Sequence, residues 1–241
     1  MSTHNSKATA KSRRARWSVG EILRLLELEY GPFEWSRRFD PLTELIFTIL
    51  TQHTSDITAE RALIELKKAF ISWEDVLEAE VSEIEAVIKV SGLARQKARR
   101  IQGALLKILQ AKGRLDLEFL RELSLDDAKA WLRDLPGVGP KTAGIVLSFS
   151  FGMPAMAVDT HIHRVAQRIG LIGPKVSADA AHDLLESKVR PPDVFKFHVS
   201  LITHGRKVCK ALRPLCNSCV LSQKCPASTV NLKVVKPASS P

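Results

Sequence analysis

A glycine-rich turn at residues 135–143, Leu-Pro-Gly-Val-Gly-Pro-Lys-Thr-Ala, limits the folds open to this chain more than any other stretch. Glycine accepts the positive φ of a tight turn, and Pro140 suits the first position of a helix, where its missing N–H has no helical partner. A turn that leads into a helix start presents free N–H groups, which can bind a phosphate. Lys141 and Asp159 flank the apolar run that follows. We therefore expect a DNA-gripping turn beside two chemically active side chains.

The remaining chain repeats one pattern, in which apolar residues recur at helical spacing between short polar or glycine-containing corners. The clearest apolar face is formed by Leu42, Leu45, Ile46, Ile49 and Leu50. Several serines stand where they can cap the next helix, some with an acid three residues later: Ser18, Ser72 (Asp75), Ser82 (Glu85), Ser124 (Asp127) and Ser177. The pattern predicts an all-α fold of about ten helices, the last of them ending at Gly205.

The charge balance favours a polyanionic partner. The chain carries 36 Lys and Arg against 26 Asp and Glu, which gives a net charge of +10, and such an excess is typical of proteins that bind nucleic acid. Residues 1–16 contain several basic side chains, no acid and almost no apolar residue, so we expect a disordered basic tail there. An organelle transit peptide is the alternative for this segment.

The chain shows no hydrophobic signal-peptide region at its start, and its longest apolar run, Ala143 to Val158, is broken by Gly152 and Pro154. We expect that run to form a buried helix and its exit loop, with no membrane span. An intracellular monomer is predicted, cytoplasmic and nucleoid-associated if the source is bacterial.

All four cysteines lie in one short stretch, at Cys209, Cys216, Cys219 and Cys225. Disulfides are unusual in an intracellular chain, and structural thiols would be scattered through it. Zinc ribbons pair two C-x2-C knuckles, whereas this C-x6-C-x2-C-x5-C spacing has only one. Four cysteine ligands in one loop suit an iron–sulfur cluster. The neighbouring basic residues would face DNA, offset the thiolate charge, or do both: Arg206, Lys207, Lys210 and Arg213.

Two further corners stand out. Residues 51–56 are a run of six polar residues between two apolar helices, which is either a plain capped loop or a loop that presents ligand contacts. Residues 90–98 echo residues 135–143, with a glycine and an apolar residue in a turn before a lysine and an alanine. The echo adds Arg95, Arg99 and Arg100, and it is either a second phosphate-facing corner or a coincidence between two helix–turn–helix corners.

Together these motifs resemble endonuclease III, the bifunctional DNA glycosylase and abasic-site lyase of the helix–hairpin–helix glycosylase superfamily. The resemblance rests on the stretch from Leu135 to Val165, on His204-Gly-Arg206 and on the cysteine loop. It implies a two-lobed helical fold that acts on double-stranded DNA. The implied parts are a basic tail (1–16), an iron–sulfur helical lobe (17–42 with 154–228), a helical barrel lobe ending in the hairpin (43–153) and a C-terminal tail (229–241).

The resemblance also assigns the site. Lys141 falls on the family's nucleophilic lysine, Asp159 on its essential aspartate, and the four cysteines on its 4Fe–4S ligands. Residues 50–56 look like the first wedge loop, which fills the gap left by an extruded nucleotide, and Gly92-Leu93 looks like the second wedge. Whether Gln52 or His53 fills the gap stays open, because the family glutamine aligns with His53. The residues expected to contact DNA are Gln52, His53, Leu93, Arg95, Gly137, Val138, Gly139, Thr142 and His161.

The implied reaction begins when a damaged base, an oxidised pyrimidine, is extruded from the duplex into a pocket. The Lys141 amine then attacks the anomeric carbon, expels the base and forms a Schiff base, and β-elimination cuts the strand 3′ to the lesion. The amine must be neutral to attack, which burial or nearby cations favour. Asp159, at a helix start, would stabilise positive charge on the sugar or help to deprotonate the nucleophile.

Two other functions stay open. A monofunctional glycosylase of the same superfamily, such as the adenine-specific mismatch type, lacks the lysine and carries a further Glu near the first wedge loop. Here Lys141 is present, and residues 51–58 contain no Glu. A non-catalytic DNA-binding module would instead use the hairpin and the cluster for grip alone.

Overall fold

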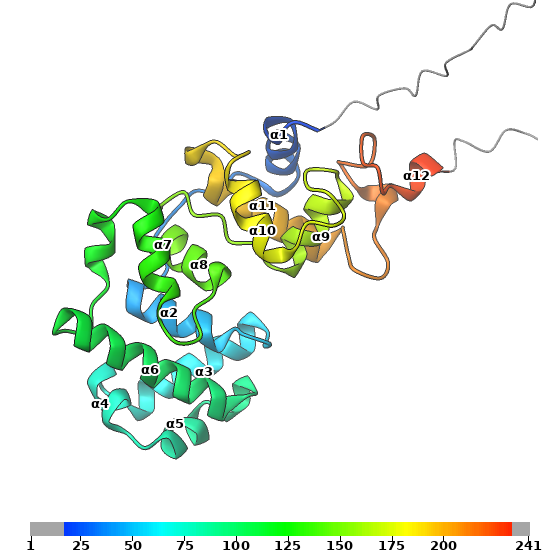
Figure 1. Ribbon diagram of the computed structural model, residues 1–241. Helices are drawn as coiled ribbons and strands as arrows, with labels where there is room; N and C mark the ends of the chain where they lie inside the picture. Colours follow the sequence, from blue (N-terminus) through cyan, green and yellow to red (C-terminus); the bar gives the residue numbers. More distant parts are fainter. Residues whose placement is uncertain (1–16, 233–241) are drawn as a thin grey trace, which may run out of the picture.

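The computed structural model describes residues 17–232, which form α-helices and short 3-10 helices with no strand among them (Figure 1). The α-helices are α1 (Val19–Tyr30), α2 (Pro41–Leu50), α3 (Asp56–Ala69), α4 (Trp73–Glu78), α5 (Val81–Val87), α6 (Ala94–Lys112), α7 (Leu125–Arg133), α8 (Pro140–Phe151), α9 (Thr160–Arg168), α10 (Ala178–Glu186), α11 (Val194–Lys207) and α12 (Thr229–Leu232). The 3-10 helices are η1 (Lys89–Ser91), η2 (Glu118–Glu122), η3 (Pro191–Asp193) and η4 (Cys216–Ser218). The predicted all-α fold is confirmed. The predicted basic tail, residues 1–16, lies outside the described residues.

Most of the predicted helix caps are present, because each serine hydroxyl accepts a hydrogen bond from the N–H three residues later. The exception is Ser82, which lies inside α5. That helix begins at Val81, two residues earlier than a Ser82 cap requires, and the Glu83 carboxylate accepts from the Glu80 N–H at 3.0 Å. This start also places Ile84 in the core with no exposed surface.

The predicted end of α11 at Gly205 is wrong, because the helix continues to Lys207. Gly205 is needed for packing and does not end the helix. A Cβ at this position would lie 2.9 Å from the His161 Cβ on α9, a distance too short for two carbon atoms. The glycine therefore lets α9 and α11 approach each other closely.

Two hydrophobic cores divide the molecule into the two lobes of Figure 1. One core is built on α2 to α8, around residues such as Leu45 and Leu147, and the other on α1 with α9 to α11, around Ile22 and Phe197. Along the chain, the core changes between Ala155 and Met156. The boundaries implied by the resemblance stay a prediction. Helix α1 packs against α11, so the two ends of the described chain share one lobe.

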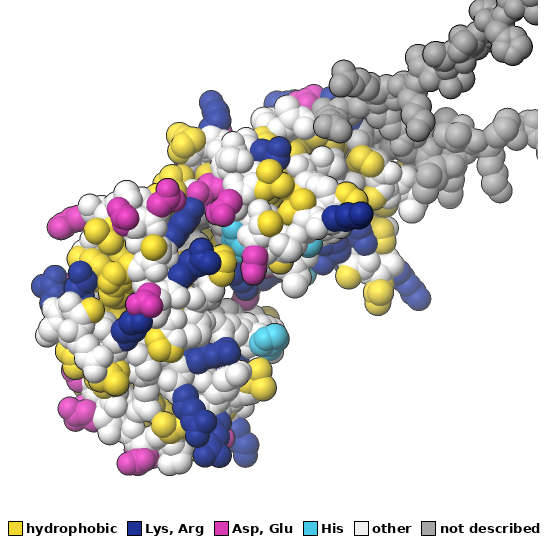
Figure 2. Space-filling view, viewed as in Figure 1, with side chains coloured by type: hydrophobic (Ala, Val, Ile, Leu, Met, Phe, Trp, Pro, Cys, Tyr) yellow, Lys and Arg dark blue, Asp and Glu magenta, His cyan; other side chains and the backbone are white. Residues whose placement is uncertain are grey.

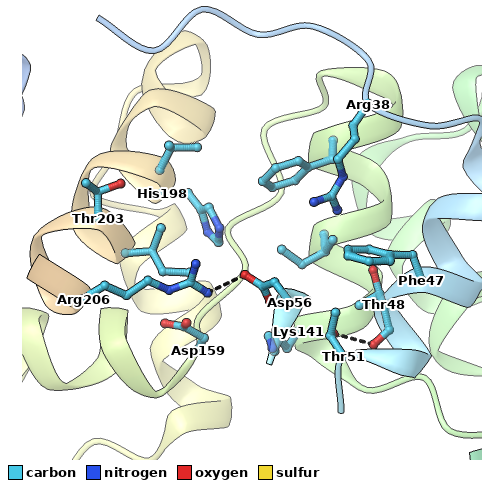
Figure 3. Close-up of a pocket in the computed structure, with 14 residues that line it drawn as sticks. Arg38, Phe47, Thr48, Thr51, Asp56, Lys141, Asp159, His198, Thr203 and Arg206 are labelled. Carbon is cyan, nitrogen blue, oxygen red and sulfur yellow. Dashed lines mark hydrogen bonds and ion pairs between the residues drawn. The ribbon is translucent and has the colours of Figure 1, made fainter. Parts of the chain in front are cut away.

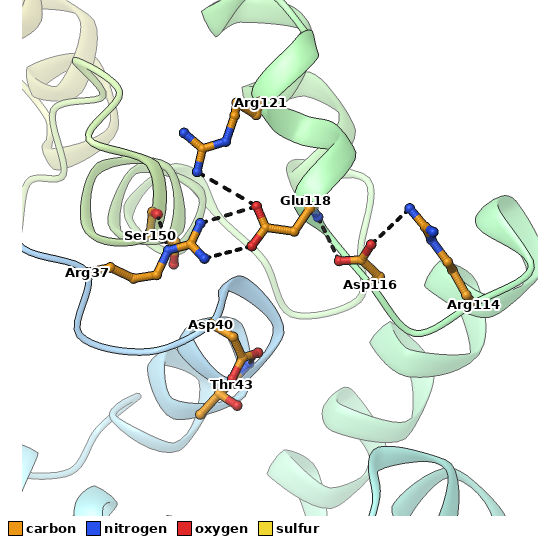
Figure 4. A network of polar contacts seen from close by, with 8 residues as sticks. All are labelled: Arg37, Asp40, Thr43, Arg114, Asp116, Glu118, Arg121 and Ser150. Carbon is orange, nitrogen blue, oxygen red and sulfur yellow. Dashed lines mark hydrogen bonds and ion pairs between the residues drawn. The ribbon is translucent and has the colours of Figure 1, made fainter.

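The segment between α1 and α2 crosses from one lobe to the other and is fixed to the barrel lobe by side-chain hydrogen bonds. Trp35 Nε1 donates to the Ser148 carbonyl at 2.8 Å, and Arg37 Nε donates to the Ser150 carbonyl at 2.9 Å. The Arg37 guanidinium also binds both carboxylate oxygens of Glu118, at 2.8 and 3.2 Å (Figure 4). These bonds hold residues 35–40 against α8. Among the described residues, no helix is both long enough and apolar enough to cross a membrane.

Candidate DNA-binding and catalytic site

The glycine turn forms as predicted at Gly137, whose φ is +77°, but not at Gly139, whose φ of −96° is extended backbone. A Cβ on Gly137 would lie 2.5 Å from the Arg100 Cδ, whereas one on Gly139 would meet nothing within 4 Å. Gly139 is the N-cap of α8, Pro140 takes the first helical position, and no side chain caps the helix. The N–H groups at this helix start are therefore left for another partner. The side chains of Val138 and Thr142 are buried, so a DNA contact there would use backbone groups.

Lys141 and Asp159 line one pocket of about 250 Å³ between the two lobes (Figure 3). Its walls come from α2, the loop after it, α3 and α8 on one side and from α11 on the other. The lining residues are Arg38, Phe47, Thr48, Thr51, Asp56, Lys141, Ile145, Phe149, Asp159, His198, Val199, Ile202, Thr203 and Arg206. Figure 2 shows Lys and Arg side chains on both lobes and a hollow between them. The two predicted active groups are thus brought together at a lobe junction.

Asp159 reaches the pocket from the exit loop that the sequence predicted after the buried helix. Helix α8 ends at Phe151, where Gly152 takes a φ of +66°, so this loop and not the helix carries Asp159. The chain between them is a buried, non-helical connection, and Asp159 caps α9 by accepting the Ile162 N–H at 2.7 Å. His198 Nδ1 lies 2.9 Å from the Ala157 carbonyl and fixes this connection to α11.

An ion pair crosses the site between the lobes. Arg206 Nη2, on α11, lies 2.8 Å from Asp56 Oδ2, at the start of α3, and both side chains are about half exposed. The sequence suggested Asp56 only as a helix cap, and it gave no signal that pairs two residues 150 positions apart. This bridge closes one side of the pocket that holds Lys141 and Asp159.

Gln52 and His53, the two candidates to fill the gap left by an extruded nucleotide, differ in their surroundings. The Gln52 amide is held at both ends, since its Nε2 donates to the Gly137 carbonyl at 2.9 Å and its Oε1 accepts from Arg100 Nη1 at 2.6 Å. His53 is exposed and takes a positive φ of +54°. Leu93, the predicted second wedge, is 54% exposed with a φ of +49°. Non-glycine residues seldom adopt positive φ, and such strain is concentrated at functional loops.

Lys97 joins the two loops that carry His53 and Leu93, a role that sequence reasoning missed. Its side chain is 1% exposed, and its Nζ donates to the carbonyls of Leu50 and Ser91 at 2.7 Å each. Burial, with a smaller effect of Arg100, lowers the pKa of Lys97 to about 8. The echo of the hairpin motif included this lysine, but it suggested either a phosphate-facing corner or a coincidence, and not a buried tie between loops.

Two other predicted DNA contacts lie apart from one another. Arg95 is exposed near the start of α6, close in sequence to Leu93. His161 lies near the start of α9 and is half-buried, with its Nδ1 3.1 Å from Arg164 Nη2. The Arg164 guanidinium also donates to the Gly205 carbonyl at 2.9 Å, so His161 is held against α11.

The four cysteines lie in the loop after α11 and around η4, with Cys209 buried and the other three half-buried. Burial, together with the three neighbouring thiols, raises the pKa of Cys219 to about 11. Arg168 Nη1 and His204 Nε2 each lie 3.5 Å from a cysteine sulfur, those of Cys209 and Cys219. Within residues 17–232, no three His, Cys, Asp or Glu side chains converge in a way that would hold a single metal ion.

Comparison with known proteins places this geometry in a family. A family model described as the HhH-GPD superfamily of base excision DNA repair proteins matches residues 46–191. The chain is 35% identical to endonuclease III of Thermotoga maritima over 187 residues, 77% of this chain and 83% of the relative. It is 34% identical to endonuclease III of Synechocystis over 230 residues, 95% and 99% of the two chains. It spans 57% of the length of an Arabidopsis thaliana relative, to which it is 38% identical over 170 residues.

Solved structures lead to the same family. A trapped endonuclease III–DNA covalent intermediate superposes with a TM-score of 0.76 at 30% identity, covering 89% of this chain and 97% of that one. A thermostable thymine-DNA glycosylase gives a TM-score of 0.70 at 25% identity, covering 87% and 94%. The chain therefore belongs to the HhH-GPD superfamily of base excision DNA repair proteins, and the predicted enzyme class, a DNA glycosylase with abasic-site lyase activity that resembles endonuclease III, is confirmed.

Proposed function

We propose that Lys141 is the nucleophile and Asp159 the charge-stabilising carboxylate of this enzyme. The observation that carries the proposal is that both side chains line the same pocket, beside a helix start that has no side-chain cap. A phosphate bound at the hairpin would bring the neighbouring nucleotide to this pocket. Every residue of the pocket lining belongs to one chain, so the monomer that the sequence predicted suffices to form the pocket.

The reaction proceeds by covalent catalysis at the sugar. The neutral Lys141 amine bonds to C1′ while the bond from C1′ to the base breaks, and the base leaves as the neutral species after taking a proton. The sugar ring opens to a Schiff base on Lys141, loss of a C2′ proton expels the 3′ phosphate, and water releases the lysine. The Asp159 carboxylate, which lies at the start of α9 and lines the same pocket as Lys141, stabilises the positive charge that develops on the sugar.

The substrate is a damaged base in double-stranded DNA, and an oxidised pyrimidine is the class that the family resemblance implies. His53 and Leu93 fill the space vacated by the extruded nucleotide, because both are exposed on strained loops and Lys97 ties those loops together. Gln52 instead positions the hairpin through its bond to Gly137. Arg95 and the helix start at α8 bind the phosphates.

The cysteine loop fits a 4Fe–4S cluster. Each cysteine of such a cluster binds a different iron, so the thiolates need not converge on one point, in agreement with the lack of a single-ion site in the described residues. The pKa values of Cys219 and Cys225 are raised by burial and by the neighbouring thiols, so these two side chains need a cationic centre to hold them as thiolates. Cys209, Cys216, Cys219 and Cys225 would hold the cluster, which shapes the basic loop around it.

Borohydride trapping on DNA with an abasic site tests the lysine. The wild-type chain should give a covalent adduct, and Lys141→Gln should give none while still binding the DNA. Lys68→Gln, which removes a 65% exposed lysine at the end of α3, is the matched control and should trap normally. A wild-type chain that yields no adduct would contradict the proposal and favour the monofunctional alternative or a binding module.

Metal content tests the cluster separately. Purified protein should be brown and contain four irons and four sulfides per chain, the content of one 4Fe–4S cluster. A colourless protein that carries zinc would overturn this assignment without affecting the assignment of Lys141.

A further inference from the structure

The end of the pocket away from Lys141 and Asp159 is occupied by Arg38 (Figure 3). This arginine comes from the segment between α1 and α2, and its guanidinium lies over three aromatic rings. The distances from Cζ to the ring centres are 4.6 Å for Phe47 and 5.2 Å for Phe149 and Phe39. Phe47 and Phe149 also line the pocket. Arg38 is thus held at the pocket by aromatic faces.

The guanidinium is oriented by a carboxylate that the fold of α2 does not need. All ten residues of α2 are buried, and the only acid among them, Glu44, has no exposed side-chain surface. Arg38 Nε donates to Glu44 Oε2 at 3.1 Å, and Arg38 Nη2 forms an ion pair with Glu44 Oε1. Burial raises the pKa of Glu44, while the Arg38 guanidinium favours its charged form. Since buried ion pairs rarely stabilise a protein more than apolar residues do, the pair calls for a reason other than stability.

The ion pair between Arg38 and Glu44 leaves the Nη1 donors of Arg38 available to a ligand in the pocket. Glu44 occupies Nε and Nη2 of Arg38, while Nη1 has no partner among the described residues, and the side chain is 40% exposed. Arginine has five N–H donors and no acceptor. A group at this end of the pocket that offers a carbonyl oxygen is therefore accepted, whereas an amino group in the same place is not.

Arg38 lies beside α8, and its level along the axis of that helix indicates which edge of an extruded base it meets. Lys141, Ile145 and Phe149 line the pocket on successive turns of α8, so Lys141 and Phe149 are about 12 Å apart along the axis. Lys141 must reach the sugar carbon, and Arg38 lies over Phe149. In a pyrimidine the atom across the ring from the glycosidic N1 is C4. The substituent at C4 thus extends from the sugar end of the pocket toward Arg38.

We propose that Arg38, oriented by Glu44, selects extruded pyrimidines that carry a carbonyl at C4 over those that carry an amino group there. The enzyme would then act on lesions derived from uracil and thymine in preference to those derived from cytosine. The proposal rests on the proposed function, because it assumes that Lys141 marks the sugar end. Glu44 is a positioning residue, and Arg38 determines specificity.

Two lesions that differ only at C4 provide the test. Single-turnover excision is measured for 5-hydroxyuracil and 5-hydroxycytosine in otherwise identical duplexes, with cleavage of a preformed abasic site measured for the same preparation. The full-length wild type should remove 5-hydroxyuracil at least tenfold faster. Each excision rate is divided by the abasic-site cleavage rate of the same preparation. A general loss of Lys141 reactivity therefore does not change the comparison between the two lesions. A wild type that does not cleave the abasic duplex would contradict the proposed function itself. A wild type that cleaves it but shows no preference between the two lesions would contradict only the role of Arg38.

The decisive variant is Arg38→Met combined with Glu44→Leu, which replaces the ion pair by two apolar side chains and leaves no buried charge. The preference for 5-hydroxyuracil should fall by about tenfold to a hundredfold, the range expected for one hydrogen bond from a charged donor. Arg37→Met is the matched control, because Arg37 binds Glu118 and the Ser150 carbonyl and does not line the pocket. The proposal is overturned if the double variant retains the wild-type ratio, or if the wild type prefers 5-hydroxycytosine.

Discussion

Replacing Lys97 by methionine should change the stability of the enzyme by an amount that depends on pH. The Lys97 side chain is 1% exposed, and burial lowers its pKa from 10.5 to about 8. Between these two pH values the unfolded chain binds the proton and the folded chain does not, so the free energy of unfolding of the wild type rises with pH. At about 1.4 kcal/mol per pKa unit, this rise amounts to about 3 kcal/mol by pH 10.5.

Methionine removes the buried charge but leaves the Leu50 carbonyl without its donor. The Ser91 carbonyl still accepts from the Thr54 hydroxyl, so it keeps one partner. An unsatisfied buried carbonyl costs about 1–3 kcal/mol, which is comparable with the cost of the charge that methionine relieves at pH 7. Lys97→Met should therefore be close to the wild type in stability at pH 7 and about 3 kcal/mol less stable than it near pH 10.5.

Urea unfolding followed by tryptophan fluorescence, at steps from pH 7 to pH 10.5, measures this difference. Lys68→Met, which removes an exposed lysine on α3, reports the effect of losing a surface charge. The wild-type and Lys97→Met curves must diverge as the pH rises. Parallel curves would show that the folded protein keeps the Lys97 ammonium charged, and would refute the account of the tie between the two loops.

Three further predictions concern the hairpin, the lobe junction and the DNA. Gly137→Ala should lower the free energy of unfolding by about 1–2 kcal/mol in a denaturation experiment, because its φ is +77° and its Cβ would displace Arg100, while Gly139→Ala should leave it unchanged. Gly144→Ala should slow abasic-site cleavage more than it weakens binding, since its Cβ would lie 3.2 Å from the Ala157 backbone, in the connection that carries Asp159. Fluorescence-anisotropy titrations should show DNA affinity falling steeply with salt, and a flat response would contradict phosphate binding.

The sequence predicted features that depend on neighbours along the chain. Ser18 and Ser72 cap their helices, because the serine hydroxyl accepts from the N–H three residues later and the acid at that position accepts from the serine N–H. The same rule misplaced the start of α5, where Glu80 and Glu83 offered a competing arrangement next to Ser82. Gly205 looked like a helix end for a similar reason, although its function depends on α9, distant in sequence. Local patterns cannot tell a glycine that ends a helix from one that packs against another.

The pocket was predictable only in part. The resemblance joined Lys141 to Asp159, but it could not supply Arg38 and Glu44, whose pairing requires a connecting segment to fold back on a buried helix face. Gln52 and His53 are adjacent in the sequence and nearly equal in polarity. Their different roles depend on Arg100 and on the Gly137 carbonyl, which approach only in the folded chain.

Because α1 shares a core with α9 to α11, the two lobes can complete their folding only in a fixed order during synthesis. Helix α1 is synthesised before the barrel lobe, but the residues that bury its apolar face begin at Met156, after that lobe. The barrel lobe, which is continuous from α2 to α8, can condense while the rest of the chain is still being made. The pocket gains its α11 wall, with Arg206, only when synthesis has passed that helix. A nascent chain therefore carries Lys141 before α11 is available to complete the pocket around it.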